Sequence, residues 1–242
     1  MKKLKEKIYE TYFSSHYSSL DEKQNSLVLL KNSLHGRQYI EFLPKEKDLK
    51  IIDLGCGTGS LVSGLINAGF SNVSGIDFSK ENVSQGNAAG LIISQGEIEE
   101  FLKSSIEVDT KFDVIFLLDV LEHLDDEELY NILDKIYKSL TSSGTLIVKT
   151  INAESLISGM ARYMDITHER SFTSHSIKEL MTTFNFINLE ILNKKLNKPK
   201  TLKNYVRLII RKCWYYFIYK IVESREYPQC IDVDIVIKVQ KG

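Results

Sequence analysis

The stretch that decides the fold reads Lys50-Ile51-Ile52-Asp53-Leu54-Gly55-Cys56-Gly57-Thr58-Gly59. Its apolar half predicts a short buried strand, and three glycines at alternate positions predict a tight turn. Residues 60–69 then have the pattern of a helix. A helix start behind a glycine turn offers unpaired backbone N–H groups and the positive end of the helix dipole. We therefore expect a ligand-binding cradle at this point of the chain.

The same order of strand, loop and helix recurs along the next hundred residues. Strands are predicted at 51–54, 72–77, 91–94, 112–118 and 145–150. After the first helix, further helices are predicted at 79–88, in a segment that ends at about 103, and at 125–140. Such repeats with short connections predict a parallel, doubly wound α/β sheet. Residues 187–192 and 231–239 alternate like paired edge strands. We expect a Rossmann-like sheet of about seven strands with the last antiparallel, preceded by N-terminal helices and interrupted by a helical insertion before the last strand.

The overall composition narrows the classes of protein to which this chain can belong. The chain has 242 residues, of which 43% are hydrophobic, and a net charge near −1, so nothing global favours nucleic acid as a partner. Three cysteines form no disulfide framework, which favours a reduced, cytoplasmic setting. We expect no signal peptide, because the first ten residues lack an apolar core, and no transmembrane span.

The identity of the ligand follows from what the cradle lacks. A nicotinamide fingerprint requires a third glycine at position 60, which is Ser60, and no Walker lysine follows the turn. Asp53 is a poor neighbour for pyrophosphate but a good one for an ammonium group. Asp77, at the end of the second strand, suits the two hydroxyls of a ribose, and Glu97 suits the amine of an adenine. A ligand with these three parts and no phosphate is S-adenosylmethionine.

On these residues the chain resembles the class I S-adenosylmethionine-dependent methyltransferases over about residues 45–190. Their motifs match Asp53 to Gly59, Asp77 with Phe78, residues 95–98, and residues 112–123, with Glu97 where an aspartate is common. The resemblance implies the following cofactor contacts: Asp53, Gly55, Cys56, Gly57, Gly59, Asp77, Phe78, Gly96, Glu97, Ile98, Asp119 and Val120. It also implies one methyltransferase domain over 1–242, with a helical lead (1–44), a cofactor-binding core (45–193), a basic aromatic insertion (194–230) and a final strand (231–242).

Methyl transfer is an in-line displacement, and a hydroxyl acceptor gains from a general base. Base candidates lie in two segments. Asp119, Glu122 and His123 crowd the loop after the fourth strand, where Glu-His-Leu often only orients the loop in the wider family. Asp165, His168 and Arg170 lie after the fifth strand, in a segment that is very polar for a connector. The alternative for that segment is a capped lead-in to a helix from Ser176.

The same segment is similar to methyltransferases encoded with bacterial surface-polysaccharide synthesis, such as O-antigen and capsule. That branch shares Asn152-Ala-Glu-Ser, Asp-x-Thr-His-Glu-x-x-Phe-Thr from 165, and Tyr12-Phe-Ser-Ser-His-Tyr17. The resemblance implies that the acceptor is a sugar hydroxyl or a phosphate-type group on a glycan. It implies His168 as general base, with Asp165 or Arg170 fixing either His168 or the acceptor. The expected substrate contacts are Asn152, Arg170 and Tyr17. Two alternatives stay open: a small-molecule O- or N-methyltransferase of a quinone-like or secondary-metabolite kind, and a non-catalytic cofactor-binding scaffold.

A metal site is a further alternative. Asp119-x-x-Glu122-His123 is similar to a run in ubiquinone-pathway O-methyltransferases for which a divalent cation has been proposed. The motif is loose, and we assign no metal ligands from it.

The insertion is strongly basic: residues 191–222 contain nine Lys or Arg and no acidic residue. Cations alternate there with Trp, Tyr, Leu and Ile. Such a helix can lie in a membrane interface, which would suit a lipid-linked glycan acceptor. The alternative is an ordinary helix that packs on its own domain or on a second subunit. We therefore expect a cytoplasmic protein with a candidate peripheral contact to the inner membrane face through 201–222.

Overall fold

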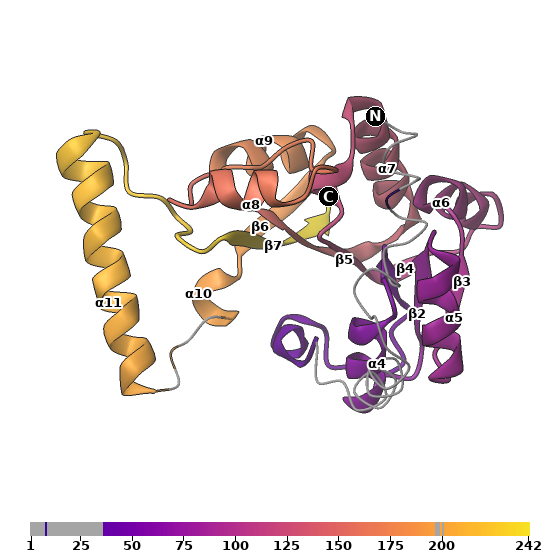
Figure 1. The fold of residues 1–242 in the computed structure, drawn as a ribbon. Coiled ribbons are helices and arrows are strands. Elements are labelled where there is room, and N and C mark those ends of the chain that lie inside the picture. Colours follow the sequence, from indigo (N-terminus) through magenta and orange to yellow (C-terminus); the bar gives the residue numbers. More distant parts are fainter. Residues whose placement is uncertain (1–7, 9–35, 197–198, 200) are drawn as a thin grey trace.

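The computed structural model describes Ile8, residues 36–196, Pro199 and residues 201–242. Its centre is a seven-stranded sheet in the order β3-β2-β1-β4-β5-β7-β6 (Figure 1). The strands are β1 (Ile51–Leu54), β2 (Val73–Asp77), β3 (Ile93–Gln95), β4 (Phe112–Leu118), β5 (Leu140–Ile151), β6 (Phe186–Ile191) and β7 (Asp234–Lys241). The first five are parallel, and β7 runs antiparallel to both of its neighbours, β5 and β6. The predicted fold class is therefore confirmed.

Helices cover both faces of the sheet. They are α4 (Ser60–Asn67), α5 (Lys80–Ala88), α6 (Ile98–Glu107), α7 (Asp126–Ser139), α8 (Ser158–Met164), α9 (Ser174–Thr183), α10 (Asn193–Leu196) and α11 (Leu202–Tyr216), with short 3₁₀ turns at Arg37–Phe42 and Leu121–His123. Strand β1 contributes to two hydrophobic clusters: Ile52 and Leu54 pack with α6, α7 and α9, whereas Ile51 packs with α4 and the turn at Arg37–Phe42. Burial on both faces explains why the parallel strands are almost continuously apolar.

Local capping sets several helix starts. The Ser79 side chain accepts from the Asn82 N–H and caps α5, as the sequence predicts. Asp125 and Glu128 form a reciprocal capping box at α7. Thr173 and Ser176 form a second box, so α9 starts at Ser174, two residues earlier than predicted.

The structure differs from the sequence-based expectation in four places. The strand predicted at 145–150 is longer in the structure, because β5 already begins at Leu140 and residues 141–144 form an irregularity opposite β4. Helix α8 had no periodic signal and was not predicted. Strand β3 begins at Ile93, two residues late. Most of the predicted helical lead lies outside the described residues, and its described end at Arg37–Phe42 is a 3₁₀ turn.

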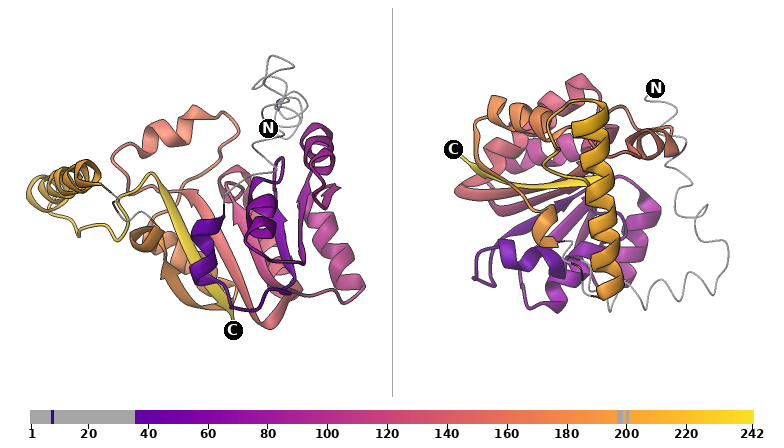
Figure 2. Two further views of the ribbon diagram at one scale, coloured as in Figure 1. Left: turned by 90° about the horizontal axis from the view of Figure 1, so that it is seen from below. Right: turned by 90° about the vertical axis from the view of Figure 1, so that its left-hand side faces the viewer.

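The insertion leaves and re-enters the sheet at the edge where the parallel strands end. Strand β6 ends at Ile191 and β7 starts at Asp234, which pairs with Ile151 at the end of β5. Between them α11 continues into a π-helical segment (Phe217–Val222) and stands away from the rest of the molecule (Figures 1 and 2). In the part of the chain that the structure describes, no helix combines the length and apolar character needed to cross a bilayer.

Candidate functional site

The glycine turn after β1 forms an open cradle. Gly59 has φ +86°, and a Cβ there would lie 2.5 Å from Ile93 Cδ1, so both the backbone and the space require glycine. Gly57 has φ +56°, and a Cβ there would meet no atom within 4 Å. The turn is therefore packed against the domain at Gly59 and open at Gly57, which is what a backbone-binding ligand needs.

Asp77 ties this turn to the start of α5. Its Oδ2 accepts the Gly57 N–H at 2.8 Å, while its Oδ1 accepts from Ser79 N at 2.9 Å and Asn82 Nδ2 at 3.2 Å. Burial raises its pKa despite these hydrogen bonds. Strands β1 and β2 thus bring the glycine turn and the predicted ribose-binding acid into direct contact. The ribose contact itself stays a prediction.

Asp53 lies buried behind the turn. Burial first, and then the neighbouring carboxyls of Asp77 and Asp119, raise the pKa of this carboxyl to about 8. A ligand that brings a positive charge would relieve this repulsion. Such a site fits the ammonium and sulfonium groups of S-adenosylmethionine better than it fits a phosphate. Burial likewise raises the pKa of the Cys56 thiol, so it stays a neutral side chain in the cradle wall.

Asp119 ends β4 in a strained conformation, with φ +57°. Its Oδ2 accepts from Lys149 Nζ at 2.8 Å, and the same ammonium lies 3.4 Å from Asp234. Burial works to lower the pKa of Lys149, but these two carboxylates raise it overall. Lys149 was not singled out in the sequence, because nothing there shows that the end of β5 meets the end of β4.

The remaining predicted cofactor residues lie around the same turn. Phe78 and Glu97 are exposed beside Asp77 and at the start of α6, where they can contact a ligand. The Gly96 N–H donates to Asp77 O at 3.1 Å. A Cβ on Gly55 would lie 2.7 Å from Val120 and 3.8 Å from Ile98, and these two side chains therefore wall the turn on its other side.

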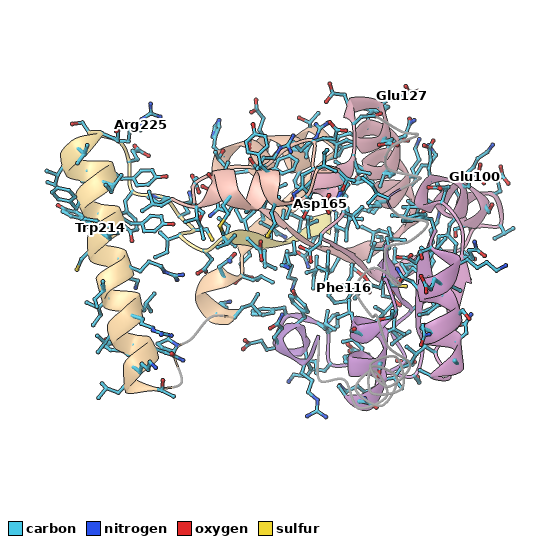
Figure 3. All side chains as sticks on the ribbon, in the orientation of Figure 1. Glu100, Phe116, Glu127, Asp165, Trp214 and Arg225 are labelled. Atoms are coloured by element: carbon cyan, nitrogen blue, oxygen red, sulfur yellow. The ribbon has the colours of Figure 1, made fainter. Side chains whose placement is uncertain are left out.

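The two segments with base candidates meet in one cluster. The N–H groups of Glu169 and Arg170 both donate to Glu122 O, at 2.6 and 3.3 Å. The rings of His123 and His168 lie 4.7 Å apart between centroids. The two histidines are separate candidates in the sequence, and the fold places them side by side. Figure 3 shows Asp165 in the body of the molecule, and Thr167 connects its carboxylate to His123.

Hydrogen bonds fix the tautomers of both rings. The Thr167 hydroxyl donates to Asp165 Oδ1 at 2.7 Å, so its oxygen accepts from His123 Nδ1 at 2.8 Å. His168 Nδ1 faces two carbonyl oxygens, Ala161 O at 3.1 Å and Arg162 O at 3.3 Å, and must donate. In the neutral form of each ring, Nδ1 therefore carries the proton and Nε2 is the nitrogen that accepts a proton or binds a metal.

Asp165 supports this arrangement as an ionised carboxylate. Partial burial works to raise its pKa, but two hydrogen bonds from Thr167 and the nearby His123 and His168 hold the pKa below its usual value. Thr167 was not singled out in the sequence. The available signal was its spacing, because an Asp commonly accepts from the residue two positions on.

Glu122 completes the cluster from the buried side. Burial raises its pKa to about 7, although the Thr150 hydroxyl donates to its Oε2 at 2.8 Å. Glu122, His123 and His168 each offer one ligand atom, and these atoms lie within 4.8 Å of one another. Asp119, the first residue of the motif similar to metal-assisted enzymes, is not in this group and pairs with Lys149. The described residues could thus bind a divalent cation through His168 in place of Asp119.

The predicted substrate-binding residues are engaged elsewhere. Arg170 donates from Nε to Leu124 O and pairs with Asp126 at 3.0 Å, so it fixes the loop to the start of α7. Asn152 is fully buried, and its amide donates to the carbonyls of Cys230 and Asp232. Their contacts to a substrate stay predictions. Tyr17 lies outside the described residues.

Next to the histidine cluster, α8 and its flanks expose a set of large apolar side chains. Exposed members are Leu156, Ile157, Met160, Tyr163, Met164 and Ile166. They occupy the segment between β5 and the polar residues from Asp165 to Arg170. An acceptor that reaches the histidines therefore meets an apolar surface.

Comparisons with known proteins agree with this geometry. A family model described as a methyltransferase domain matches residues 32–191. The chain is 31% identical over 136 residues to the mitochondrial ubiquinone biosynthesis O-methyltransferase of Dictyostelium discoideum, and 34% over 109 residues to the ubiquinone biosynthesis O-methyltransferase of Rickettsia bellii (strain OSU 85-389). These matches cover 50% and 43% of this chain, and the chain spans only 39% and 43% of the two relatives.

A solved structure shows the same fold. The crystal structure of a SAM-dependent methyltransferase from Archaeoglobus fulgidus aligns with TM-score 0.63 at 21% identity, over 95% of this chain and 98% of that one. Neither of the two sequence relatives is named for polysaccharide synthesis, so the predicted branch finds no support among them.

Proposed function

This chain belongs to the methyltransferase-domain family and uses S-adenosylmethionine as cofactor, and from that premise we propose that it methylates an oxygen of a small, largely apolar acceptor such as a phenol or quinol. The relatives named for ubiquinone biosynthesis support this small-molecule alternative over the expected sugar acceptor.

One observation carries the proposal: exposed apolar side chains directly adjoin a pair of histidines with fixed tautomers. Met160, Met164 and Ile166 are 62%, 75% and 66% exposed, next to Asp165 and His168. Apolar side chains of this kind line ligand sites, and a few polar groups orient the ligand. A sugar would find few hydrogen-bonding partners on this surface.

In this proposal His168 Nε2 accepts the proton of the acceptor hydroxyl as the oxygen forms its bond to the methyl carbon. Bound S-adenosylmethionine supplies the electrophilic methyl group and a sulfur leaving group. His123, held through Thr167 by Asp165, fixes the neighbouring ring and offers a second proton acceptor. Glu122 adds a carboxyl whose pKa of about 7 lets it share the proton near neutral pH.

The test is methyl transfer to matched acceptors, measured by mass spectrometry of the products. We expect a catechol with an alkyl chain to become a methyl ether with a lower KM than catechol itself, and nucleotide sugars to remain unmodified. Met164→Glu should raise the KM for the alkylated acceptor at least ~10-fold, a loss typical of removing apolar contact. The control Val108→Glu, at the exposed end of α6, should leave it unchanged. Methylation of nucleotide sugars alone would contradict the proposal.

A further inference from the structure

Helix α11 turns a broad apolar face away from the domain. Exposed members of this face are Leu202, Tyr205, Val206, Ile209, Ile210, Trp214, Tyr216 and Phe217. At about 100° per residue they fall on one half of the helix circumference. Figure 1 and the left view of Figure 2 show α11 to one side of the sheet and its helices, and Figure 3 places Trp214 on it, far from Asp165.

Contacts with the domain use the opposite stripe. Tyr215 is 4% exposed, and its hydroxyl accepts the Leu156 N–H at 2.9 Å. Arg211 pairs with Asp232 at 2.7 Å, and the Tyr219 hydroxyl donates to Glu154 O at 2.7 Å. The expected packing of the insertion on its own domain is thus confined to this stripe. Among the described residues nothing covers the apolar half.

Charge distinguishes between two partners for the apolar face of α11, a second copy of the chain and a lipid surface. Residues 201–222 carry five cations and no acid. On the helix Lys203 and Arg207 lie at one margin of the apolar face and Lys212 lies at the other, while Arg211 is already paired. A second copy that packed the same helix face-to-face would meet cations at its margins and no acid to pair with them. An anionic lipid surface satisfies the cations and the apolar face together.

We propose that α11 docks on the surface of a bilayer that contains anionic phospholipids, with its apolar face in the interface and its marginal cations on the head groups. Tyr205, Trp214 and Tyr216 suit the interface, because each combines an apolar ring with a polar edge. The bonds from Tyr215 and Tyr219 attach α11 to residues 154–156, which lead into α8. Docking therefore attaches α8 and its exposed apolar side chains to a membrane-bound helix, and their use in binding the acceptor rests on the function proposed above.

The chain contains a single tryptophan, so Trp214 reports directly on this face. The full chain is mixed with vesicles of phosphatidylcholine alone, or of phosphatidylcholine with phosphatidylglycerol, and both co-sedimentation and Trp214 fluorescence are recorded. We expect binding and a blue shift with the anionic vesicles, and at least ~10-fold weaker binding in high salt. Absence of binding to the anionic vesicles would overturn the proposal.

Matched variants locate the contact. Ile210→Glu, at a position 63% exposed on the apolar face, should abolish binding, whereas Val108→Glu, at a position 73% exposed on α6, should leave it intact. Lys203→Gln with Arg207→Gln should weaken only the binding to anionic vesicles. Equal losses from Ile210→Glu and Val108→Glu would contradict docking through α11. A different outcome is that the wild type does not bind vesicles, forms a dimer in sedimentation velocity, and loses that dimer in Ile210→Glu. This outcome would overturn membrane docking and assign the apolar face to a second copy of the chain. These measurements do not use methyl transfer, so they succeed or fail independently of the proposed function.

Discussion

The Nδ1 atom of His123 lies 2.8 Å from the hydroxyl oxygen of Thr167, which follows 44 residues later in the chain. The same hydroxyl donates to Asp165, so a carboxylate acts on the ring through one intervening group. This contact connects the loop after β4 to the segment after β5. It also assigns the proton of the neutral His123 ring to Nδ1.

Replacing Thr167 by valine keeps the volume but removes the hydroxyl. We expect kcat to fall ~10-fold with S-adenosylmethionine affinity retained, and the pH–rate profile to move, because His123 Nδ1 loses its acceptor and Asp165 loses a donor. Thr167→Ser should restore both the rate and the profile. Steady-state kinetics over pH provide the measurement, and Thr182→Val on the exposed side of α9 is the control. An unchanged profile in Thr167→Val would show that Thr167 only supports the loop.

His168→Ala removes the proposed base. We expect turnover to fall at least ~10²-fold, as for loss of a general base, while calorimetry shows nearly unchanged affinity for S-adenosylmethionine. His175→Ala is the matched control, because this histidine is exposed on α9. If His168→Ala retains activity, the ring has a structural role.

Asp53 should couple cofactor affinity to pH. Its pKa of about 8 means that the carboxyl is mostly protonated at neutral pH, and a cationic ligand favours the ionised form. Affinity for S-adenosylmethionine should therefore rise ~10-fold between about pH 6 and pH 7.5, with release of a proton. Calorimetry in buffers of different ionisation enthalpy measures the proton, and Asp53→Asn should remove the dependence. Affinity that stays constant over this range in the wild type would contradict the assignment.

Glu122 should make the free energy of unfolding decrease as pH rises, whereas a carboxylate held in a salt bridge makes it increase. Its pKa is raised from 4.5 to about 7, so the folded state holds a proton that the unfolded state has lost between these values. The free energy of unfolding therefore falls as pH rises from about 4.5 to 7, and the loss persists above 7.

Glu122→Gln cannot ionise and should escape this loss. With chelator present, its free energy of unfolding relative to wild type should increase by up to ~3 kcal/mol between about pH 5 and pH 8. Denaturant titrations at several pH values give the measurement, with Glu127→Gln on the exposed face of α7 as control. Parallel pH curves for wild type and Glu122→Gln would refute the assignment.

Local patterns account for most of the correct predictions about the fold. Ile51, Ile52 and Leu54 and the three glycines after them predicted β1 and its turn, because these residues have few other ways to satisfy burial and backbone geometry. Ser79 predicted the start of α5 from a single local hydrogen bond. Helix α8 gave no such signal, since its apolar side chains are largely exposed and lack a buried stripe.

The sequence by itself determined the order of the strands, the glycine cradle and the nature of its ligand, because each depends on contacts among neighbouring residues or on the ends of consecutive parallel strands. Only the tertiary structure decided that Thr167 connects Asp165 to His123, that Lys149 pairs with Asp119 and Asp234, and that His168 joins Glu122. The segments that meet here are separated along the chain, and their meeting depends on where β4 and β5 end and where β7 begins. The outward direction of the α11 apolar face was settled in the same way, by the bonds of Arg211, Tyr215 and Tyr219 to the domain.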